Sequence, residues 1–366
     1  MDNSGKKMDK TPQSVIRDEI RALSAYHVPD SRGMVKLDAM ENPYALPPAL
    51  CAEIGELSAG AALNRYPDPV AAPLKARLRE AMQVPDGIEL LLGNGSDELI
   101  QIVALAVNRP GAALMSVEPS FAMFKMIATY TGLRYIGVPL ASGFGLDAAR
   151  MRSEIAHHQP ALVFIAYPNN PTGNLFDADA VRAVIEACQG LVVVDEAYHV
   201  FAQKSFVPEL ERYPNLLVMR TLSKLGLAGL RLGMLIGRPQ WLAELDKLRL
   251  PYNVNVLTQK LATHVLGRAN VLQAQAAAIL GERARVAAVL SSMPDVTPFP
   301  SEANFILFRV ARADAVFASL KARGVLIKNL HASHPSLTDC LRVTVGTPEE
   351  NAQFLSALHE SLRQAA

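Results

Sequence analysis

Cysteine is scarce in this 366-residue sequence, which contains only Cys51, Cys188 and Cys340. An odd number of cysteines without a C-x-x-C spacing indicates neither a disulfide framework nor a zinc site. We therefore expect a protein of the reducing cytoplasm with no bound metal. Cys188 and Cys340 lie in hydrophobic runs, where a cysteine is usually a small core residue, so we assign them no chemistry.

Long hydrophobic runs are also missing. No window offers about 18 uncharged hydrophobic residues in a row, and the first ten residues contain no signal-peptide core, so the sequence predicts neither membrane insertion nor export. Basic residues are not in excess either, because 36 Lys and Arg stand against 35 Asp and Glu, giving a formal net charge of +1. We expect no nucleic acid partner, since phosphate-backbone binding requires a basic surplus.

What the sequence does contain is ample material for a hydrophobic core, with 50% hydrophobic and 19% charged residues. Short runs rich in Leu, Val and Ile predict buried strands of a parallel sheet. Amphipathic stretches at 96–108 and 177–188 predict helices between them. The alternation indicates a doubly wound, mostly parallel α/β fold. The predicted strands are 88–92, 161–167, 191–194, 216–219 and 233–236.

A second, smaller unit is predicted toward the C-terminus. Ala-rich helical sequence at 271–291 leads away from the sheet, and strands at 303–310 and 341–345 alternate with helices at 312–323 and 348–364. We expect residues 1–46 to pack against this α+β unit. The predicted domains are therefore 47–275, a large domain, and 1–46 with 276–366, a small domain built from both termini.

The most informative segment is 221–231, where Lys224 lies among small residues. Thr221 and Ser223 provide hydroxyl donors, and Arg231 can form a bidentate contact with a phosphate dianion. A lysine in this setting can form a Schiff base with an aldehyde, and burial beside cationic groups favours its neutral, nucleophilic form. This pattern predicts a pyridoxal phosphate lysine, although most lysines are ordinary surface residues.

Asp195 follows the hydrophobic run 191–194, so we expect it at the carboxyl end of a buried strand, where open α/β sheets bind ligands. A carboxylate there would keep a pyridine nitrogen protonated, which lets the ring accept electrons. Tyr198, three residues on, offers a phenol to the same site. The alternative for Asp195 is a simple cap of the following helix.

Two further turns and one aromatic residue complete the predicted site. Residues 93–97 are Gly-Asn-Gly-Ser-Asp and precede a predicted helix, whose N-terminus could bind an anion. They lack the third glycine of a dinucleotide-binding motif and the lysine of a P-loop, so a small cofactor phosphate fits better than a nucleotide. Asn170, before Pro171, either forms an ordinary turn or donates to a cofactor ring oxygen, with a cis Asn170–Pro171 bond aiming it. Phe121 either stacks on the ring or belongs to the core.

Together these residues resemble the fold-type I pyridoxal phosphate enzymes, the aspartate aminotransferase superfamily, over nearly the whole chain. Within it, the sequence is similar to the histidinol-phosphate aminotransferase family. That resemblance implies a cytoplasmic homodimer of histidine biosynthesis that exchanges an amino group between histidinol phosphate and 2-oxoglutarate. The segments that carry it are Met40-Glu41-Asn42-Pro43-Tyr44, Arg65-Tyr66-Pro67-Asp68, Asp195-Glu196-Ala197-Tyr198, Leu227-Ala228-Gly229-Leu230-Arg231 and Cys340-Leu341-Arg342-Val343-Thr344-Val345-Gly346.

The resemblance also implies roles for individual residues. Lys224 holds the cofactor and then carries a proton, and Asp195 holds the pyridinium. Tyr66 reaches the neighbouring subunit's phosphate. The residues implied at the ring hydroxyl are Asn170 and Tyr198, those at the phosphate are Gly95, Ser96, Asp97, Thr221, Ser223 and Arg231, and those at the substrate are Arg342, Tyr26, Lys328 and Asn170.

Two positions depart from the family pattern. Phe121 stands where relatives stack a tyrosine, so it keeps the stacking without a hydroxyl. Lys328 stands where relatives often carry a second substrate-binding arginine, and a lysine lacks the bidentate fork. His331 and His334, just beyond, have no metal spacing and are interpreted as loop residues.

Other functions remain open at the level of sequence. An aromatic or broad-specificity aminotransferase, or a decarboxylase of a phosphorylated amino acid, would share the cofactor site and differ at the substrate clamp. A regulatory domain that binds the cofactor without turnover usually carries a DNA-binding module, and residues 1–45 show no helix-turn-helix. A non-enzymatic interaction protein would not need Lys224, Asp195 and Arg231 together.

Overall fold

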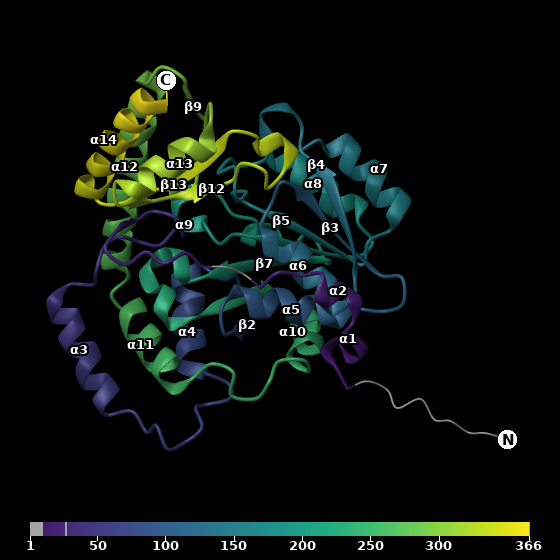
Figure 1. Ribbon diagram of the computed structural model, residues 1–366. Coiled ribbons are helices and arrows are strands. Elements are labelled where there is room, and N and C mark those ends of the chain that lie inside the picture. Colours follow the sequence, from purple (N-terminus) through teal and green to yellow (C-terminus); the bar gives the residue numbers. More distant parts are fainter. Residues whose placement is uncertain (1–9, 26–27, 366) are drawn as a thin grey trace.

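The computed structural model describes residues 10–25 and 28–365, and a seven-stranded sheet forms its centre (Figure 1). Five neighbouring strands of the sheet pair in parallel, and β8 runs antiparallel to both of its neighbours. In spatial order the strands are β2 (Glu89–Gly93), β8 (Gly233–Gly237), β7 (Leu216–Thr221), β6 (Leu191–Asp195), β5 (Leu162–Ala166), β3 (Ala113–Glu118) and β4 (Arg134–Pro139).

The strands are buried on both faces because helices cover both sides of the sheet. Alternate residues of β6 enter different cores: Val192 and Val194 belong to one cluster, and Leu191 and Val193 belong to the other. This explains the unbroken hydrophobic runs of the central strands. The first cluster is completed by α4 (Ala72–Met82), α7 (Ala148–His158), α8 (Ala178–Ala187) and α11 (Val256–Leu266), and the second by α5 (Ser96–Val107), α6 (Ala122–Thr131) and α10 (Pro239–Asp246).

The predicted fold class is confirmed, with two corrections to the strands. The run at 233–236 forms β8, which is antiparallel and not parallel as predicted. Strands β3 and β4 were not predicted. In β3 the hydrophobic run is short, because its second half is Ser-Val-Glu. In β4, an edge strand, side chains are partly exposed, so no continuous hydrophobic run marks it. The other four predicted strands of this sheet form β2, β5, β6 and β7.

A smaller unit lies at the C-terminal end of the chain. Its four-stranded antiparallel sheet packs on three helices. A two-stranded parallel pair joins β1 (Val35–Lys36) to β11 (Val325–Leu326), so the N-terminal segment contacts this unit. The sheet contains β12 (Lys328–Asn329), β13 (Cys340–Thr344), β10 (Phe305–Val310) and β9 (Val296–Pro298), and the helices are α12 (Ala269–Ser292), α13 (Ala313–Ala322) and α14 (Pro348–Ala365).

The boundary between the two units falls on a continuous helix. α12 runs without interruption from Ala269 to Ser292 and so includes residue 275. The division into 47–275 and 1–46 with 276–366 stays a prediction. The remaining helices are α1 (Pro12–Val15), α2 (Asp18–Arg21), α3 (Pro48–Ala59) and α9 (His199–Ala202), and among the described residues no helix is long and hydrophobic enough to cross a membrane.

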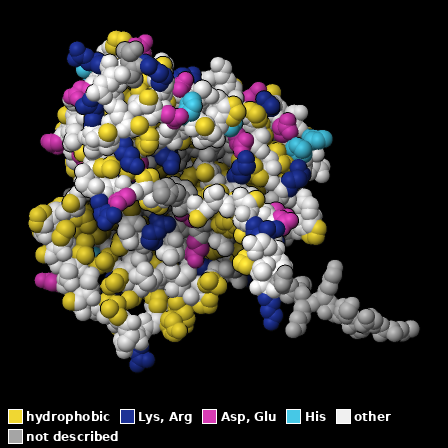
Figure 2. Space-filling model, viewed as in Figure 1, with side chains coloured by type: hydrophobic (Ala, Val, Ile, Leu, Met, Phe, Trp, Pro, Cys, Tyr) yellow, Lys and Arg dark blue, Asp and Glu magenta, His cyan; other side chains and the backbone are white. Residues whose placement is uncertain are grey.

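Exposed large hydrophobic side chains gather on two loops. One loop lies between α3 and α4, and the other lies between α10 and α11. In Figure 2 hydrophobic side chains are prominent on the lower part of the molecule, where these loops run in Figure 1. The exposed large hydrophobic residues of the two loops are Leu63, Tyr66, Val70, Leu248, Leu250 and Tyr252.

Candidate active site

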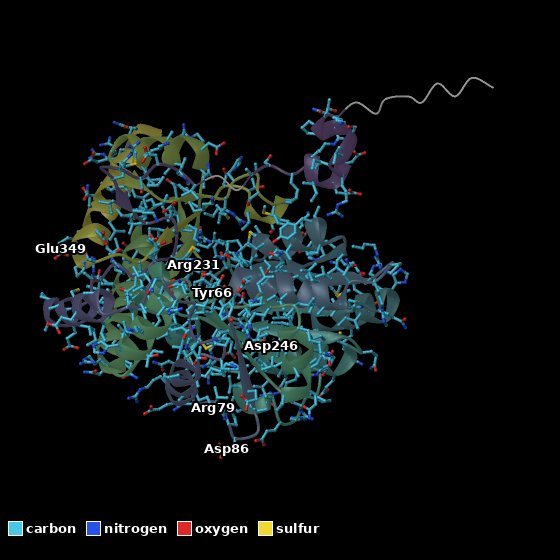
Figure 3. The ribbon with its side chains drawn as sticks, turned by 90° about the horizontal axis from the view of Figure 1, so that it is seen from below. Tyr66, Arg79, Asp86, Arg231, Asp246 and Glu349 are labelled. Atoms are coloured by element: carbon cyan, nitrogen blue, oxygen red, sulfur yellow. The ribbon has the colours of Figure 1, made fainter. Side chains whose placement is uncertain are left out.

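A cavity opens at the carboxyl ends of β5, β6 and β7, beside the N-terminus of α5. It encloses about 600 Å³, including its opening to solvent. This edge of the sheet is where parallel α/β proteins bind ligands. Figure 3 labels Arg231, one of the residues that line the cavity. The lining consists of Met40, Ser96, Asp97, Phe121, Ala166, Pro168, Asn170, Asp195, Ala197, Tyr198, Thr221, Ser223, Lys224 and Arg231.

Lys224 lies in a π-helical turn, Ser223–Leu227, that directly follows β7. Its amine donates a hydrogen bond to the carbonyl oxygen of Ala39, 3.0 Å away. Burial, followed by the positive charge of Arg342, lowers the pKa of Lys224 to about 8. A substantial fraction of the amine is therefore neutral near pH 8, as a nucleophile or general base requires.

Asp195 is the last residue of β6 and is only 5% exposed. One of its carboxylate oxygens accepts a hydrogen bond from the backbone N–H of Ala197 at 3.0 Å. Burial raises the pKa of Asp195 to about 7. A cationic group placed against this carboxylate would favour its ionised form, so the site suits a protonated ring nitrogen.

A buried ion pair involves Glu196, the residue that follows Asp195 in the chain. Glu196 is fully buried and contacts Arg220 of β7, with 2.9 Å between the guanidinium nitrogen and the carboxylate oxygen. Ser205 donates to the same carboxylate, and Arg220 also donates to the carbonyl of Met82 at the end of α4. The pair thereby ties the ends of β6 and β7 to each other. In the sequence, the only indication of this ion pair was a charged residue at or just after the end of each hydrophobic run: Glu196 after β6 and Arg220 near the end of β7.

Three side chains form a chain of hydrogen bonds across the cavity. The amide of Asn170 donates to the hydroxyl of Tyr198 at 3.2 Å, and the guanidinium of Arg342 donates to the amide oxygen of Asn170. Arg342 belongs to β13 and also donates to the carbonyl of Asp38 at 3.0 Å. The smaller unit therefore places a cation next to Asn170, whose bond to Pro171 is cis.

The N-terminus of α5 and the turn after β7 form a cradle for an anion. Gly95 precedes α5 with a φ of +88°, and an added Cβ would lie 2.5 Å from a guanidinium nitrogen of Arg231. That nitrogen lies 3.7 Å from the carboxylate of Asp97. The hydroxyl of Thr221 donates to that of Ser223 at 3.0 Å. Helix amides, hydroxyls and a guanidinium together are the donors that bind a phosphate.

Comparison with known proteins identifies the family. The family model for aminotransferase class I and II matches residues 32–358. The chain belongs to the class I and II aminotransferases. Histidinol-phosphate aminotransferase 2 of Cupriavidus pinatubonensis is 57% identical over 356 residues, which cover 96% of this chain and 97% of the relative. Histidinol-phosphate aminotransferase 1 of Ralstonia nicotianae is 55% identical over 354 residues, 95% of each chain.

A solved structure shows the same aminotransferase fold. Histidinol-phosphate aminotransferase from Sinorhizobium meliloti, in complex with pyridoxal-5'-phosphate, superposes with a TM-score of 0.87, covering 96% of this chain and 99% of that one at 24% identity. The resemblance to histidinol-phosphate aminotransferases stated from the sequence is confirmed by the identities of the relatives above.

In this aminotransferase, Phe121 lines the cavity and packs edge-on against Phe124, with 5.6 Å between ring centroids. It therefore contacts both the cavity and the core, the two alternatives considered from the sequence. Lys328 does not line the cavity but pairs with Arg342 across β12 and β13. Tyr66 is 80% exposed and lies outside the cavity lining. Tyr26 lies outside the described residues.

The two histidines after β12 take part in loop hydrogen bonds. His331 accepts a hydrogen bond from the backbone N–H of Asp339 at 2.9 Å, and His334 accepts one from that of Ser336 at 3.2 Å. Among residues 10–25 and 28–365 no group of three or more His, Cys, Asp or Glu side chains is placed to hold a metal ion.

Sequence reasoning missed the N-terminal segment at the site. Met40 lines the cavity with a left-handed φ of +53°, and Asp38 and Ala39 direct carbonyl oxygens at Arg342 and Lys224. The segment contributes mainly backbone groups, so its side chains carry little signal. The only indication was that residues 40–44 belong to the family resemblance.

Proposed function

We propose that this aminotransferase uses pyridoxal phosphate to exchange the amino group between L-histidinol phosphate and 2-oxoglutarate in histidine biosynthesis. The observation that carries the proposal is that the amine of Lys224 and the buried carboxylate of Asp195 line one cavity, while the guanidinium of Arg342 contacts Asn170 in its lining. The names of relatives at 57% and 55% identity support the choice of amino donor.

The phosphate end of the cavity fits the cofactor. The N-terminus of α5 begins at Ser96, and Thr221, Ser223 and Arg231 add hydroxyl donors and a cation. Gly95 leaves the space that the Arg231 guanidinium occupies, because any Cβ there would lie 2.5 Å from it. This donor set matches a phosphate dianion.

The ring end of the cavity fits the cofactor equally well. Asp195 offers a buried carboxylate for the ring nitrogen, Asn170 and Tyr198 offer polar groups for the ring hydroxyl, and Phe121 offers an aromatic face. When bound, pyridoxal phosphate supplies an aldehyde that takes up the amino group and a ring that accepts electrons from the substrate carbon.

Lys224 has two assigned tasks in this proposal. Its amine would hold the cofactor covalently, and its free, neutral form would accept a proton from the substrate carbon and return it. Burial and the charge of Arg342 lower its pKa to about 8, which keeps it close to the pH at which a general base works best. Asp195 meanwhile keeps the ring nitrogen protonated through its negative charge.

Arg342 and Lys328 form the proposed clamp for the anionic end of the substrates. They lie directly opposite each other in the antiparallel β12–β13 pair, so two cations share one face of the smaller sheet. The guanidinium of Arg342 can bind a carboxylate or a phosphate through two parallel hydrogen bonds. Its contact with Asn170 places this clamp next to the cofactor ring.

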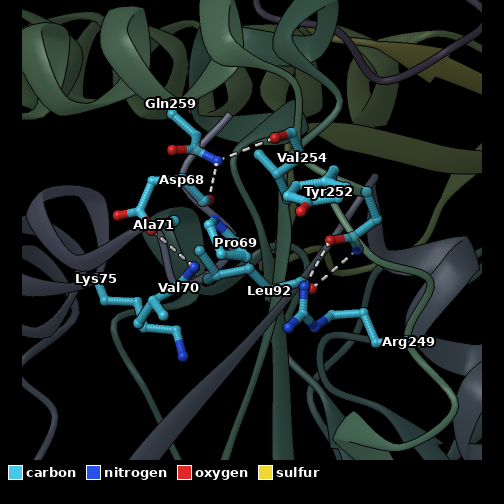
Figure 4. Close-up of a pocket in the computed structure, with 11 residues that line it drawn as sticks. Asp68, Pro69, Val70, Ala71, Lys75, Leu92, Arg249, Tyr252, Val254 and Gln259 are labelled. Carbon is cyan, nitrogen blue, oxygen red and sulfur yellow. Dashed lines mark hydrogen bonds between the residues drawn. The ribbon is translucent and has the colours of Figure 1, made fainter. Parts of the chain in front are cut away.

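A second copy of this chain is the proposed protein partner. Two of the exposed hydrophobic residues on the loops 63–70 and 248–252, Val70 and Tyr252, line the pocket drawn in Figure 4. Burying the exposed hydrophobic residues of both loops would favour association. The family resemblance places Tyr66 at the neighbouring subunit's phosphate, which agrees with its exposure and with its absence from the lining of this chain's own cavity. A cytoplasmic location stays a prediction from that resemblance.

The dependence of turnover on an oxo acid tests the reaction class. With histidinol phosphate as donor, product should form only when 2-oxoglutarate is present, and Lys224→Ala should abolish turnover while the fold is retained. Release of carbon dioxide from a phosphorylated amino acid without an oxo acid would assign the site to a decarboxylase. Faster turnover with phenylalanine or tyrosine than with histidinol phosphate would assign it to an aromatic aminotransferase.

A further inference from the structure

The ring of Tyr66 stacks on the ring of Tyr252. The ring centroids are 4.4 Å apart and the planes differ by 15°. Tyr66 is 80% exposed and Tyr252 is 40% exposed, so neither ring belongs to the core of the chain. An exposed tyrosine has several accessible rotamers, and a parallel neighbouring ring restricts them.

The backbone of Tyr252 is held in an unusual conformation. Its φ is +60°, in the left-handed region that residues with a side chain rarely adopt. Such a conformation persists only where the surroundings stabilise it, and it is enriched at functional sites. With this backbone conformation, the ring of Tyr252 stacks on that of Tyr66.

The loops that carry the two rings are tied together at their base. The amide of Gln259 donates to the carbonyl of Asp68 at 2.8 Å and to that of Val254 at 3.0 Å, as the dashed lines in Figure 4 show. The carboxylate of Asp68 accepts hydrogen bonds from the backbone N–H groups of Val70 and Ala72, which fixes the start of α4. Hydrogen bonds therefore link the two loops at their base, while both rings are exposed.

Asn253, next to Tyr252, connects this arrangement to the Gly-rich loop of the same chain. Its amide donates to the carbonyl of Leu92 at 3.2 Å and to the carboxylate of Glu98 at 2.7 Å. The same Glu98 oxygen accepts from the backbone N–H of Asn94 at 2.5 Å. The Tyr252 loop is thus positioned relative to the phosphate cradle at the N-terminus of α5.

We propose that Tyr252 is a positioning residue that holds Tyr66 in the orientation needed at the neighbouring subunit's phosphate. This inference rests on the composite dimeric site proposed above. Tyr252 makes no contact with the cofactor in this account; it acts through Tyr66, and Asn253 and Glu98 set its place relative to its own subunit's cradle. A variant that loses the ring at 252 should therefore weaken cofactor binding in the other subunit.

The first test measures the dissociation constant of pyridoxal phosphate by equilibrium dialysis, with dimer formation followed by sedimentation. Tyr252→Phe keeps the stacked ring and should bind like the wild type. Tyr252→Leu removes it and should bind roughly three- to tenfold more weakly, in line with the energy of an aromatic pair. Tyr66→Phe, which keeps the ring and removes the hydroxyl, should also weaken binding. Normal binding by Tyr252→Leu alongside weakened binding by Tyr66→Phe would overturn only the positioning role.

The second test asks in which subunit the effect appears. Two hybrid dimers are prepared, each with one Lys224→Ala subunit, so that borohydride reduction can attach the cofactor to only one site. When Tyr252→Leu lies on the Lys224→Ala subunit, cofactor should leave the intact lysine site faster than from the wild type. When Tyr252→Leu lies on the subunit that keeps Lys224, release should be normal.

The opposite pattern, or equal release from both hybrids, would contradict the proposal, because a purely structural defect would act within its own subunit. A chain that is monomeric, or in which Tyr66→Phe binds normally, would overturn the composite site and the positioning role with it.

Discussion

The amine of Lys224 and the carbonyl of Ala39 lie 3.0 Å apart although 185 positions separate them in the chain. The preceding carbonyl, of Asp38, accepts a hydrogen bond from Arg342. Met40 follows with a left-handed backbone, held because its N–H donates to the hydroxyl of Thr344 at 2.9 Å. One short N-terminal segment therefore contacts both Lys224, in the turn after β7, and Arg342, in β13 of the smaller sheet.

The charge of Arg342 should control the titration of Lys224. Arg342→Gln removes a positive charge that disfavours protonation of the amine, so the pKa of Lys224 should rise above about 8. Because only the neutral amine attacks an aldehyde, covalent attachment of pyridoxal to the cofactor-free protein at a pH below about 8 should slow. Borohydride trapping across a pH series measures this, and Arg342→Lys, which keeps the charge, should retain the original profile. If attachment showed the same pH midpoint in Arg342→Gln and Arg342→Lys, the charge of residue 342 would not control the pKa of Lys224.

Asp195 should make the cofactor-free protein less stable as the pH rises. Burial raises the pKa of Asp195 from 3.8 to about 7, so between these values the folded state binds more protons than the unfolded state. Stability present at low pH is then lost as the pH rises through about 7. Asp195→Asn cannot ionise at this position, so the variant should not lose this stability as the pH rises. The melting temperature of the variant should exceed that of the wild type at pH 8 but not at pH 4. A constant difference at both pH values would show that burial of this carboxylate does not cause it.

Removing only one partner of the buried pair Glu196–Arg220 should lower the free energy of unfolding by a large amount. Arg220→Met leaves a carboxylate buried without its cation, which typically costs about 3–5 kcal/mol. Denaturant unfolding of the cofactor-free protein measures the change. The double variant Glu196→Gln with Arg220→Met should lose less than the sum of the two single changes, because the residues interact directly. Strict additivity would rule out this coupling.

Lys328 should affect the phosphorylated substrate more than the oxo acid. Removing the ammonium group in Lys328→Ala takes away one charge-assisted hydrogen bond, which corresponds to roughly a tenfold higher KM for histidinol phosphate. We expect a smaller change in the KM for 2-oxoglutarate, since Arg342 can bind a carboxylate alone. Lys328→Arg is the matched control and should keep a low KM for the donor. Equal changes for both substrates would place Lys328 outside the phosphate clamp.

Hydrophobic runs sufficed to predict the centre of the sheet, because β5, β6 and β7 are buried on both faces. They did not suffice for β4, whose position at the sheet edge leaves side chains partly exposed. The antiparallel direction of β8 was missed for a related reason: its composition resembles that of a parallel strand, and direction depends on the path of the chain between strands.

Side chains of the candidate site could be anticipated where a strand end places them. Asp195 is the last residue of β6 and Lys224 lies in the turn after β7, and the structure brings both to one cavity. The role of backbone carbonyls, as at Ala39, leaves no mark in residue type. The stack between Tyr66 and Tyr252 depends on two loops meeting in space, which no local pattern predicts.

The absorption spectrum of the cofactor-loaded protein, recorded after addition of histidinol phosphate without an oxo acid, shows whether the amino group is transferred to the cofactor. The account predicts that the visible band of the cofactor bound to Lys224 disappears as the amino group is transferred, and that 2-oxoglutarate restores it. The same experiment with Lys224→Ala should show no such cycle. A wild-type band that stays unchanged with histidinol phosphate, or that is lost and cannot be restored by 2-oxoglutarate, would contradict the proposed transamination.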